Sequence, residues 1–364
     1  MKRFRPLAFS LPLFSLLPAL LSAAPLPESR HVWLDAPAEE FFEATPLGNG
    51  RLGASVYGGI TEEKIVLNEN GMWSGSPQDA DRPGAAAVLP EIRRLLLAGK
   101  NAEAEALVNA HFTCAGEGSG HGAGANVPYG CYQTLGALQL TFVGPNAAAP
   151  ATRYRRELDL ATATARVTYR QHDIDFTRDA FVSAPAEAIV LRYTASAPGQ
   201  LSFDARLTRA ERATTTGIGS DGLCMTGQLN DGREGGTGVR YAARLQAIPV
   251  GGTVTVEGDV LHVRDADEVV LLITAATDIK TFAGRHLTDA LAAAKADLAT
   301  ARQSNYPELL AQHVADYRHY FDRVALQLGA PDPAAATQTT PQRLQTFHAG
   351  EADPSLAALY FNFG

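Results

Sequence analysis

Three closely spaced glycines near the start of the chain have the spacing of a phosphate-binding loop. They form the pattern Gly48-x-Gly50-x-x-Gly53. A dinucleotide site needs these glycines between a strand and a helix, so that the helix N-terminus faces the pyrophosphate. Residues 54–60 are interrupted by glycine and have no 3.6-residue periodicity, and residues 64–68 are typical of a strand. The pattern therefore indicates strand, turn and strand, and it predicts tight turns and close packing instead of nucleotide binding.

A polar and aromatic cluster follows directly. Asn68 and Glu69 end the strand-like segment, and Asn70 and Trp73 come next. An indole ring can stack on a sugar, and amide and carboxylate groups can form hydrogen bonds with its hydroxyl groups. We therefore predict that Asn68, Glu69 and Trp73 bind substrate at the wall of a pocket mouth, without a role in proton transfer. The alternative is a loop-capping Asn/Glu pair beside a core tryptophan.

Other polar residues have simpler interpretations. His111, Cys114, His121 and Cys131 could be drawn as a metal site, but zinc ligands usually form tighter pairs, so we expect no metal. Cys114 and Cys131 flank a glycine-rich loop, where they could form a disulfide or stay reduced.

Two further groups of polar residues are interpreted as structural. Arg153, Arg155 and Arg156 are expected on the solvated side of a strand. His313 and Tyr317 lie one helical turn apart, which predicts packing or hydrogen bonding between a helix and the β domain.

The composition and the N-terminal residues limit which classes of partner and which cellular compartment are expected for the protein. The chain of 364 residues has a net charge of −8 and no basic block, so we expect no nucleic-acid surface. Residues 1–24 combine a basic start, a proline-interrupted apolar stretch and the small residues Ser22-Ala23-Ala24, which is the pattern of a signal peptide. The apolar stretch is too short for a comfortable membrane span. We expect an exported protein, periplasmic or secreted, without a membrane span.

The middle of the chain has the pattern of strands. Apolar and polar residues alternate over 138–142, 165–170, 201–207 and 239–245. Residues 268–273 form a continuous apolar segment, which suits a strand covered on both faces. Many alternating strands without intervening helices predict a mainly β fold, a large antiparallel β-sandwich over residues 25–280.

Helical patterns lie before and after these strands. In residues 85–97 we expect Ile92, Leu95 and Leu96 on one helical face, and Asn101 is expected to cap a second helix through residue 110. Residues 286–301 and a helix from Tyr306 predict a helical linker over 281–330. The apolar stripe expected on the second linker helix consists of Leu310, Val314, Tyr317 and Phe321. Residues 329–341 have the composition of a linker, and a third helix starts near Asp353.

Seven motifs in order connect the chain to a known family. They are Trp33-Leu34-Asp35-x-Pro37-Ala38-Glu39-Glu40, Pro46-Leu47-Gly48-Asn49-Gly50-Arg51-Leu52-Gly53-Ala54, Leu67-Asn68-Glu69 with Trp73-Ser74-Gly75, Tyr132-Gln133-Thr134-Leu135-Gly136, Tyr154-Arg155-Arg156-Glu157-Leu158-Asp159-Leu160, His313-x-x-Asp316-Tyr317 with Phe321-Asp322-Arg323-Val324, and Leu359-Tyr360-Phe361-x-Phe363-Gly364. Together they resemble the N-terminal part of glycoside hydrolase family 95, known mainly as α-L-fucosidases. The chain departs from the family at Asn70-Gly71-Met72, where Asp-Thr-Leu is usual, and at Thr134, where proline is usual.

The resemblance implies a division of labour within a longer protein. In that family a β-sandwich leads through a helical linker into an (α/α)6 barrel, and residues 331–364 resemble its start. The family hydrolyses fucosylated glycans with inversion and without a cofactor. Its catalytic glutamate, asparagines and aspartate belong to the barrel. The resemblance therefore implies no catalytic residue in this chain, no turnover by this chain alone, and a missing C-terminal catalytic barrel as its partner.

Two alternatives remain open. The chain could be a stand-alone carbohydrate-binding β-sandwich, for which the exposed aromatic Trp73 would be the platform. Within the same family, an α-L-galactosidase-type substrate is the other possibility.

Overall fold

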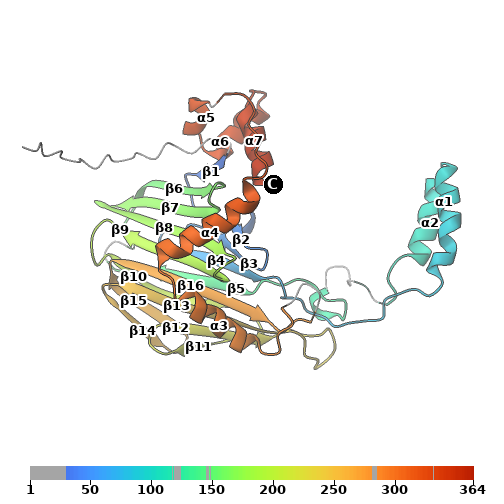
Figure 1. Cartoon of the computed structure of the whole chain (residues 1–364), viewed down its shortest axis with the longest axis horizontal. Coiled ribbons are helices and arrows are strands. Elements are labelled where there is room, and N and C mark those ends of the chain that lie inside the picture. Colours follow the sequence, from blue (N-terminus) through green and yellow to red (C-terminus); the bar gives the residue numbers. More distant parts are fainter. Residues whose placement is uncertain are drawn as a thin grey trace, which may run out of the picture.

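The architecture is a two-layered sandwich with helices on one face and a helical arm (Figure 1). The computed structural model describes residues 30–116, 118, 124–144, 147, 149–280, 285–330 and 332–364. The predicted signal peptide, residues 1–24, lies outside this part of the chain.

The strands of the described residues are β1 (His31–Leu34), β2 (Thr45–Gly48), β3 (Leu52–Val56), β4 (Glu62–Glu69), β5 (Gly136–Phe142), β6 (Ala151–Asp159), β7 (Thr164–Gln171), β8 (Ile174–Ser183), β9 (Ala188–Ala195), β10 (Leu201–Thr208), β11 (Thr214–Ile218), β12 (Gly222–Gln228), β13 (Arg240–Val250), β14 (Thr253–Glu257), β15 (Val260–Ala266) and β16 (Glu268–Thr277). The α-helices are α1 (Leu89–Leu97), α2 (Asn101–His111), α3 (Ala290–Ala301), α4 (Tyr306–Phe321), α5 (Pro333–Thr337), α6 (Thr340–His348) and α7 (Pro354–Phe363). The same described residues include the short 3-10 helices η2 (Phe41–Glu43), η3 (Ala85–Val88) and η5 (Gly124–Asn126).

The strands form two antiparallel sheets with one core between them. One sheet has nine strands in the order β1-β6-β7-β8-β9-β16-β13-β12-β11, and the other has seven in the order β14-β15-β10-β5-β4-β3-β2. Alternate residues of β10, such as Phe203 and Ala205, are fully buried, whereas the intervening residues are partly exposed. This alternation is what a half-buried strand requires, and the predicted antiparallel β-sandwich is confirmed.

Strand β16 is covered on both faces, as its continuous apolar sequence predicts. Leu271 and Ile273 pack in the core between the sheets. Val270 and Leu272 belong to a second cluster, which Leu298 of α3 completes. Helices α3 and α4 therefore cover the outer face of the nine-stranded sheet (Figure 1).

The linker helices begin at identifiable caps. Helix α3 starts at Ala290, four residues after the predicted start, because the Asp289 side chain accepts a hydrogen bond from the Ala292 amide. Asn305 and Glu308 form a capping box at the start of α4.

The buried face of α4 differs from the predicted stripe. Leu309 and His313 are its fully buried residues, whereas Leu310 is only partly buried. Tyr317 and Phe321 stack on each other with ring centroids 5.1 Å apart, so the second half of the stripe was placed correctly. The two buried residues each lie one position before the predicted Leu310 and Val314. The apolar pattern missed this face because one of its buried positions is occupied by a polar residue, His313.

The segment after α4 is more structured than its composition indicates. The predicted linker over 329–341 contains α5 and the start of α6. The backbone amide of Trp33 in β1 donates a hydrogen bond to Thr340 Oγ1 at 3.1 Å, which ties α6 to the nine-stranded sheet. The Asp353 side chain caps α7 by accepting from the Leu356 amide.

Helices α1 and α2 form a hairpin that stands away from the sandwich (Figure 1). Ile92 and Leu95 are buried against Ala104, but Leu96, predicted on the same face, is 52% exposed. Asn101 is the first helical residue and not the predicted cap, since Lys100 occupies the N-cap position without a side-chain hydrogen bond.

Candidate functional site

The predicted site residues lie where strands of both sheets end. Asn68 and Glu69 are the last two residues of β4, and neighbouring residues of a strand point to opposite faces. Asn68 is half-buried on the outer side, whereas Glu69 faces the interior with only 2% exposure. Trp73 follows in the next loop and is 46% exposed. The three side chains are close in sequence but face different environments.

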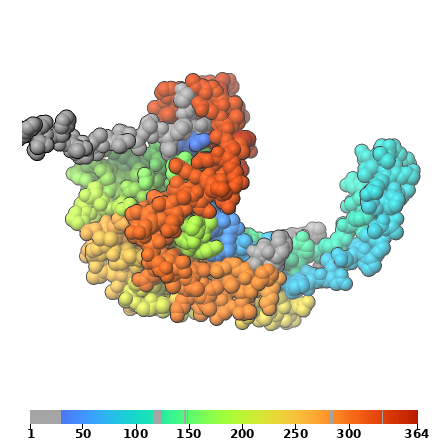
Figure 2. Space-filling model, viewed as in Figure 1, coloured from blue at the N-terminus to red at the C-terminus, as the bar shows by residue number. Residues whose placement is uncertain are grey.

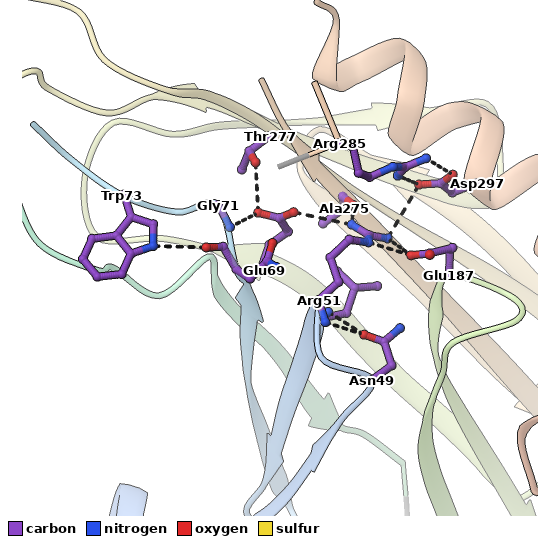
Figure 3. Close-up of polar contacts among 12 residues, drawn as sticks. Asn49, Arg51, Glu69, Gly71, Trp73, Glu187, Ala275, Thr277, Arg285 and Asp297 are labelled. Carbon is purple, nitrogen blue, oxygen red and sulfur yellow. Dashed lines mark hydrogen bonds and ion pairs between the residues drawn. The ribbon is translucent and has the colours of Figure 1, made fainter. Parts of the chain in front are cut away.

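The Glu69 carboxylate joins strands of the two sheets (Figure 3). Its Oε2 accepts hydrogen bonds from the Gly71 amide at 2.6 Å and from the Thr277 hydroxyl at the end of β16 at 3.0 Å. A Cβ atom at Gly71 would lie 2.0 Å from Thr277 Oγ1, so this contact needs glycine. Burial raises the pKa of Glu69, while these hydrogen bonds and the charge of Arg51 act in the opposite direction. The geometry gives Glu69 a positioning role, and its contact with a sugar stays a prediction.

The glycine motif forms the tight turn between β2 and β3, which excludes the strand–helix context of a dinucleotide site. Asn49 Oδ1 accepts hydrogen bonds from the Arg51 and Leu52 amides at 2.9 and 2.7 Å. Its Nδ2 donates to the Ser183 carbonyl at 2.9 Å. Gly50, with φ of 87°, supplies the left-handed residue of the turn. Asn49 therefore fastens this turn to the end of β8 in the other sheet.

Arg51 is the centre of a charged network at the same end of the sandwich (Figure 3). Its guanidinium donates to Glu187 Oε2 at 2.6 Å from Nε and to the Ala275 carbonyl at 2.6 Å from Nη1. Glu69 Oε1 lies 3.5 Å from Nη1, and Asp297 of α3 lies 3.8 Å from Nη2.

A second arginine completes this network. Arg285 holds Asp297 through two hydrogen bonds of 2.6 and 3.0 Å. The network therefore ties both sheets to the linker helix.

An exposed aromatic pair lies beside this network. Trp73 and Tyr132 form an isolated β-bridge, with ring centroids 5.6 Å apart and an interplanar angle of 64°. The indole donates to the Asn70 carbonyl at 3.1 Å, and the Tyr132 hydroxyl donates to Asn68 Oδ1 at 3.2 Å. Tyr132 is 43% exposed. Trp73, Tyr132 and Asn68 therefore present ring surfaces and an amide to the outside, a combination suited to sugar contacts.

Two alternatives raised by the sequence are a disulfide between Cys114 and Cys131 and a metal site that includes both cysteines. All three cysteines are free, with Cys114 exposed and Cys131 half-buried, so no disulfide closes the glycine-rich loop. His121 of the metal alternative lies outside the described residues. Within the part of the chain that the structure describes, no three His, Cys, Asp or Glu side chains form a group that could hold a metal ion.

The solvated position predicted for the three arginines is wrong for Arg156 and confirmed for Arg153. Arg156 is 1% exposed, and its Nη1 donates to the Glu43 carbonyl at 2.7 Å and to Thr45 Oγ1 at 3.2 Å. Arg155 covers the Trp33 ring with its guanidinium carbon 4.2 Å from the ring centroid. Arg153 alone is exposed. Burial of Arg156 is possible because backbone carbonyl groups of the β1–β2 connection accept its hydrogen bonds.

The predicted packing role of His313 and Tyr317 is confirmed. His313 stacks on Phe181 with centroids 4.7 Å apart, and its Nε2 donates to the Thr162 carbonyl at 3.0 Å. The Tyr317 hydroxyl donates to the Leu160 carbonyl at 2.7 Å. Both residues dock α4 on the β6–β7 turn.

Sequence reasoning missed most of the network. Arg51 was present only as part of a family motif, and Tyr132 likewise. Glu187 and Thr277 have no local signal, because each is distant in sequence from its partner, and the pair of Arg285 and Asp297, 12 positions apart, matches no motif. The described helices include none that is long and apolar enough to cross a membrane.

Comparisons with known proteins agree with this architecture. Residues 32–281 match the family model described as "Glycosyl hydrolase family 65, N-terminal domain". Residues 305–364 match the one described as "Glycosyl hydrolase family 95 catalytic domain".

Three curated relatives align with nearly the whole chain. The chain is 30% identical to "Alpha-L-fucosidase 2" of Arabidopsis thaliana, over 95% of this chain and 42% of the relative. It is 24% identical to "Probable alpha-fucosidase A" of Aspergillus niger, over 94% of this chain and 43% of the relative. The protein of the same name from Aspergillus oryzae is 25% identical, over 95% of this chain and 48% of the relative. The chain therefore spans less than half the length of these relatives.

Proposed function

Because this chain belongs to glycoside hydrolase family 95, we propose that it is the N-terminal portion of an exported α-L-fucosidase. The proposed reaction of the whole protein is hydrolysis of terminal α-L-fucosyl linkages with inversion at the anomeric carbon. The observation that carries the proposal is the match of residues 305–364 to a family 95 catalytic domain, directly after the sandwich and its linker helix α3. The fucosidase names of the relatives support the choice of sugar.

Within the proposed enzyme this chain supports the barrel and lines the pocket. Inverting hydrolysis needs one protonated carboxyl group and one carboxylate that activates water. At the candidate site, Glu69, Glu187 and Asp297 all lie in ion pairs with Arg51. These interactions assign them a structural role, so the proposed acid and base belong to the barrel. Asn68, Glu69 and Trp73, together with Tyr132, are the proposed sugar contacts.

Activity assays on two lengths of the protein test the proposal. Purified residues 25–364 should not hydrolyse an aryl α-L-fucoside, whereas the full gene product should. An aryl α-L-galactoside assayed in parallel distinguishes the galactosidase-type alternative. NMR detection of the first-formed anomer tests inversion. Turnover by residues 25–364, or the absence of fucoside turnover by the full gene product, would overturn the proposal.

The sugar-contact role is tested separately with Trp73→Ala in the full gene product. Loss of one aromatic stacking surface should raise KM about 2- to 10-fold. Because Trp73 is 46% exposed, the melting temperature should change little. Phe42→Ala is the matched control, since Phe42 is 79% exposed on the β1–β2 connection and outside the aromatic pair. Equal KM values for both variants would remove Trp73 from the substrate site.

Export is part of the proposal and has its own test. Cleavage after Ala24 is expected, so the mature protein recovered from the periplasm or the medium should begin at Pro25. Recovery of the intact Met1 form from the cytoplasm alone would contradict export.

The exposed Trp73–Tyr132 pair also favours a second function, a stand-alone carbohydrate-binding sandwich. In that case residues 25–364 alone should bind fucosylated oligosaccharides saturably, and Trp73→Ala should abolish binding with unchanged folding. Calorimetric titration distinguishes this function from the enzyme-fragment proposal, which predicts binding only when the catalytic domain is present.

A further inference from the structure

The helical arm is inserted between the two aromatic residues of the candidate site. We define the arm by its described residues, 76–116, 118 and 124–129, which include α1 and α2. The chain leaves the sandwich after Trp73 and returns at Tyr132, and these two residues form an isolated β-bridge. A displacement of the arm therefore acts on both rings at once.

The base of the arm is tightly held. The Ser74 amide donates to the Cys131 carbonyl at 3.1 Å, and the Ser76 amide donates to the Pro128 carbonyl at 3.0 Å. The Gly75 amide donates to the Asn230 carbonyl at 3.0 Å, which fixes the base to the sandwich. A Cβ atom at Gly130 would lie 2.0 Å from the Ser74 carbonyl oxygen, so the two backbone segments that form the base are in direct contact and leave no room for a side chain at Gly130.

The tip of the arm lacks a core of sufficient size. Helices α1 and α2 have 9 and 11 residues, below the roughly 12 to 15 residues at which isolated helices become even marginally stable. Their shared cluster contains only Ile92, Leu95 and Ala104 as buried residues. The hairpin therefore needs a further surface to pack against.

The arm also exposes apolar side chains that such a surface would cover. Leu97 is 91% exposed and Leu96 is 52% exposed. At the base of α2, Phe112 is 44% exposed. Adjacent leucines exposed at the end of one helix form a contact patch and not a scatter of single residues.

A second group of exposed apolar side chains lies on α7. Tyr360 of α7 is 83% exposed, and Phe361 and Phe363 are each 50% exposed. Figure 2 shows an open hollow between the arm and the C-terminal helices. Helix α7 lies in the segment that matches a catalytic domain, and more than half of the length of each relative lies outside the aligned part.

We propose that the arm is a clasp that docks on the catalytic domain of the full-length protein, with Leu96 and Leu97 packed against its helical surface. The clasp holds Trp73 and Tyr132 at the pocket mouth, because both rings are attached to its rigid base. This inference rests on the proposed function, since the occupant of the hollow is the proposed catalytic domain.

Hydrogen exchange tests the clasp without a mutation. In the full gene product, the amides of residues 89–111 should exchange at least 10-fold more slowly than in residues 25–364. Equal exchange rates in the two proteins would overturn the clasp. Protection that depends on protein concentration would also overturn it, because a second copy would then be the partner.

A double variant tests the contact and its consequence. Leu96→Asp with Leu97→Asp in the full gene product should speed tryptic cleavage at Arg93, Arg94 and Lys100 at least 10-fold. It should also raise KM for the fucoside about 5-fold with little change in kcat, which a merely destabilised catalytic domain would not do. Val250→Asp is the matched control, because Val250 is 56% exposed on the sandwich. Cleavage rates equal to those of the wild type would contradict the clasp.

Failure of the clasp and failure of the proposed function are distinguishable. Fucoside turnover with an unprotected arm would refute the clasp alone. A protected arm in a full-length protein without fucosidase activity would refute the proposed function and leave the clasp standing.

Discussion

Arg51 and Glu187 join the two sheets at the end of the sandwich, with Nε and Oε2 2.6 Å apart. Arg51 lies in the turn between β2 and β3, and Glu187 lies in the turn between β8 and β9. The same guanidinium also approaches Glu69 and Asp297. One arginine therefore connects the seven-stranded sheet, the nine-stranded sheet and the linker helix, next to the exposed aromatic pair.

Removing Arg51 should strongly destabilise the protein. The Arg51 side chain is 12% exposed, and Arg51→Ala leaves the Glu69 carboxylate, which is 3% exposed, without its ion-pair partner. We expect a loss of about 3 kcal/mol in the free energy of unfolding, measured by urea denaturation. Arg94→Ala is the control, because Arg94 pairs with Glu91 while 61% exposed, and its loss should change the free energy of unfolding much less. Equal costs for the two variants would show that the network carries no special stability.

Acid should weaken the attachment of β1 through Glu157. Burial alone would raise the pKa of Glu157, but the His31 imidazole, 3.2 Å from Oε2, and the hydrogen bond from Arg155 prevail and lower it to about 2. A lowered pKa stabilises the folded protein above the unfolded value of 4.5, and this contribution is lost as pH falls from 4.5 towards 2. At pH 7, Glu157→Gln should cost roughly 1 to 3 kcal/mol.

The pH dependence of this cost is the decisive measurement. The difference in unfolding free energy between the wild type and Glu157→Gln should shrink below pH 4.5. Glu103→Gln is the control, since Glu103 is 58% exposed and pairs only with Lys100. A difference that stays constant from pH 7 to 3 would contradict the assignment.

The docking of α4 should weaken at mildly acidic pH. Burial lowers the pKa of His313, although hydrogen bonds to backbone carbonyl groups oppose this shift. The folded protein therefore binds the proton less readily than the unfolded chain, and stability falls as pH drops below the unfolded value of about 6.5. His313→Gln should remove this component of the slope between pH 7 and 5, as measured by thermal unfolding. His348→Gln, at the exposed end of α6, is the matched control.

Alanine substitutions at two glycines with nearly equal φ distinguish the cost of backbone strain from the cost of a steric clash. Gly99 has φ of 74° and no atom within 4 Å of an added Cβ, so Gly99→Ala should cost about 1 kcal/mol. Gly130 has φ of 73°, and its added Cβ would lie 2.0 Å from the Ser74 carbonyl oxygen. Gly130→Ala should therefore cost about 3 kcal/mol or more and change the fluorescence of Trp73. Similar melting temperatures for the two variants would show that the backbone at the base of the arm can rearrange to accommodate the added Cβ at little cost in stability.

The sequence alone predicted the sandwich, the positions of several of its strands and the flanking helices. These features depend on short-range patterns: alternation in β10, a continuous apolar segment in β16, and capping residues at Asp353 and before α4. Each pattern depends on residues that are neighbours in the chain. It therefore predicts a helix, a strand or a buried face without knowledge of contacts between distant residues. The family motifs added the expected catalytic partner.

Only the tertiary structure decided what the polar residues do. Glu69 bonds to Thr277 across 208 positions of sequence, and Arg51 to the Ala275 carbonyl across 224. Arg156 is buried because carbonyl groups from another part of the chain accept its hydrogen bonds. A charged side chain is stable in the interior only when partners satisfy it, and those partners are set by how the sheets stack and not by local periodicity.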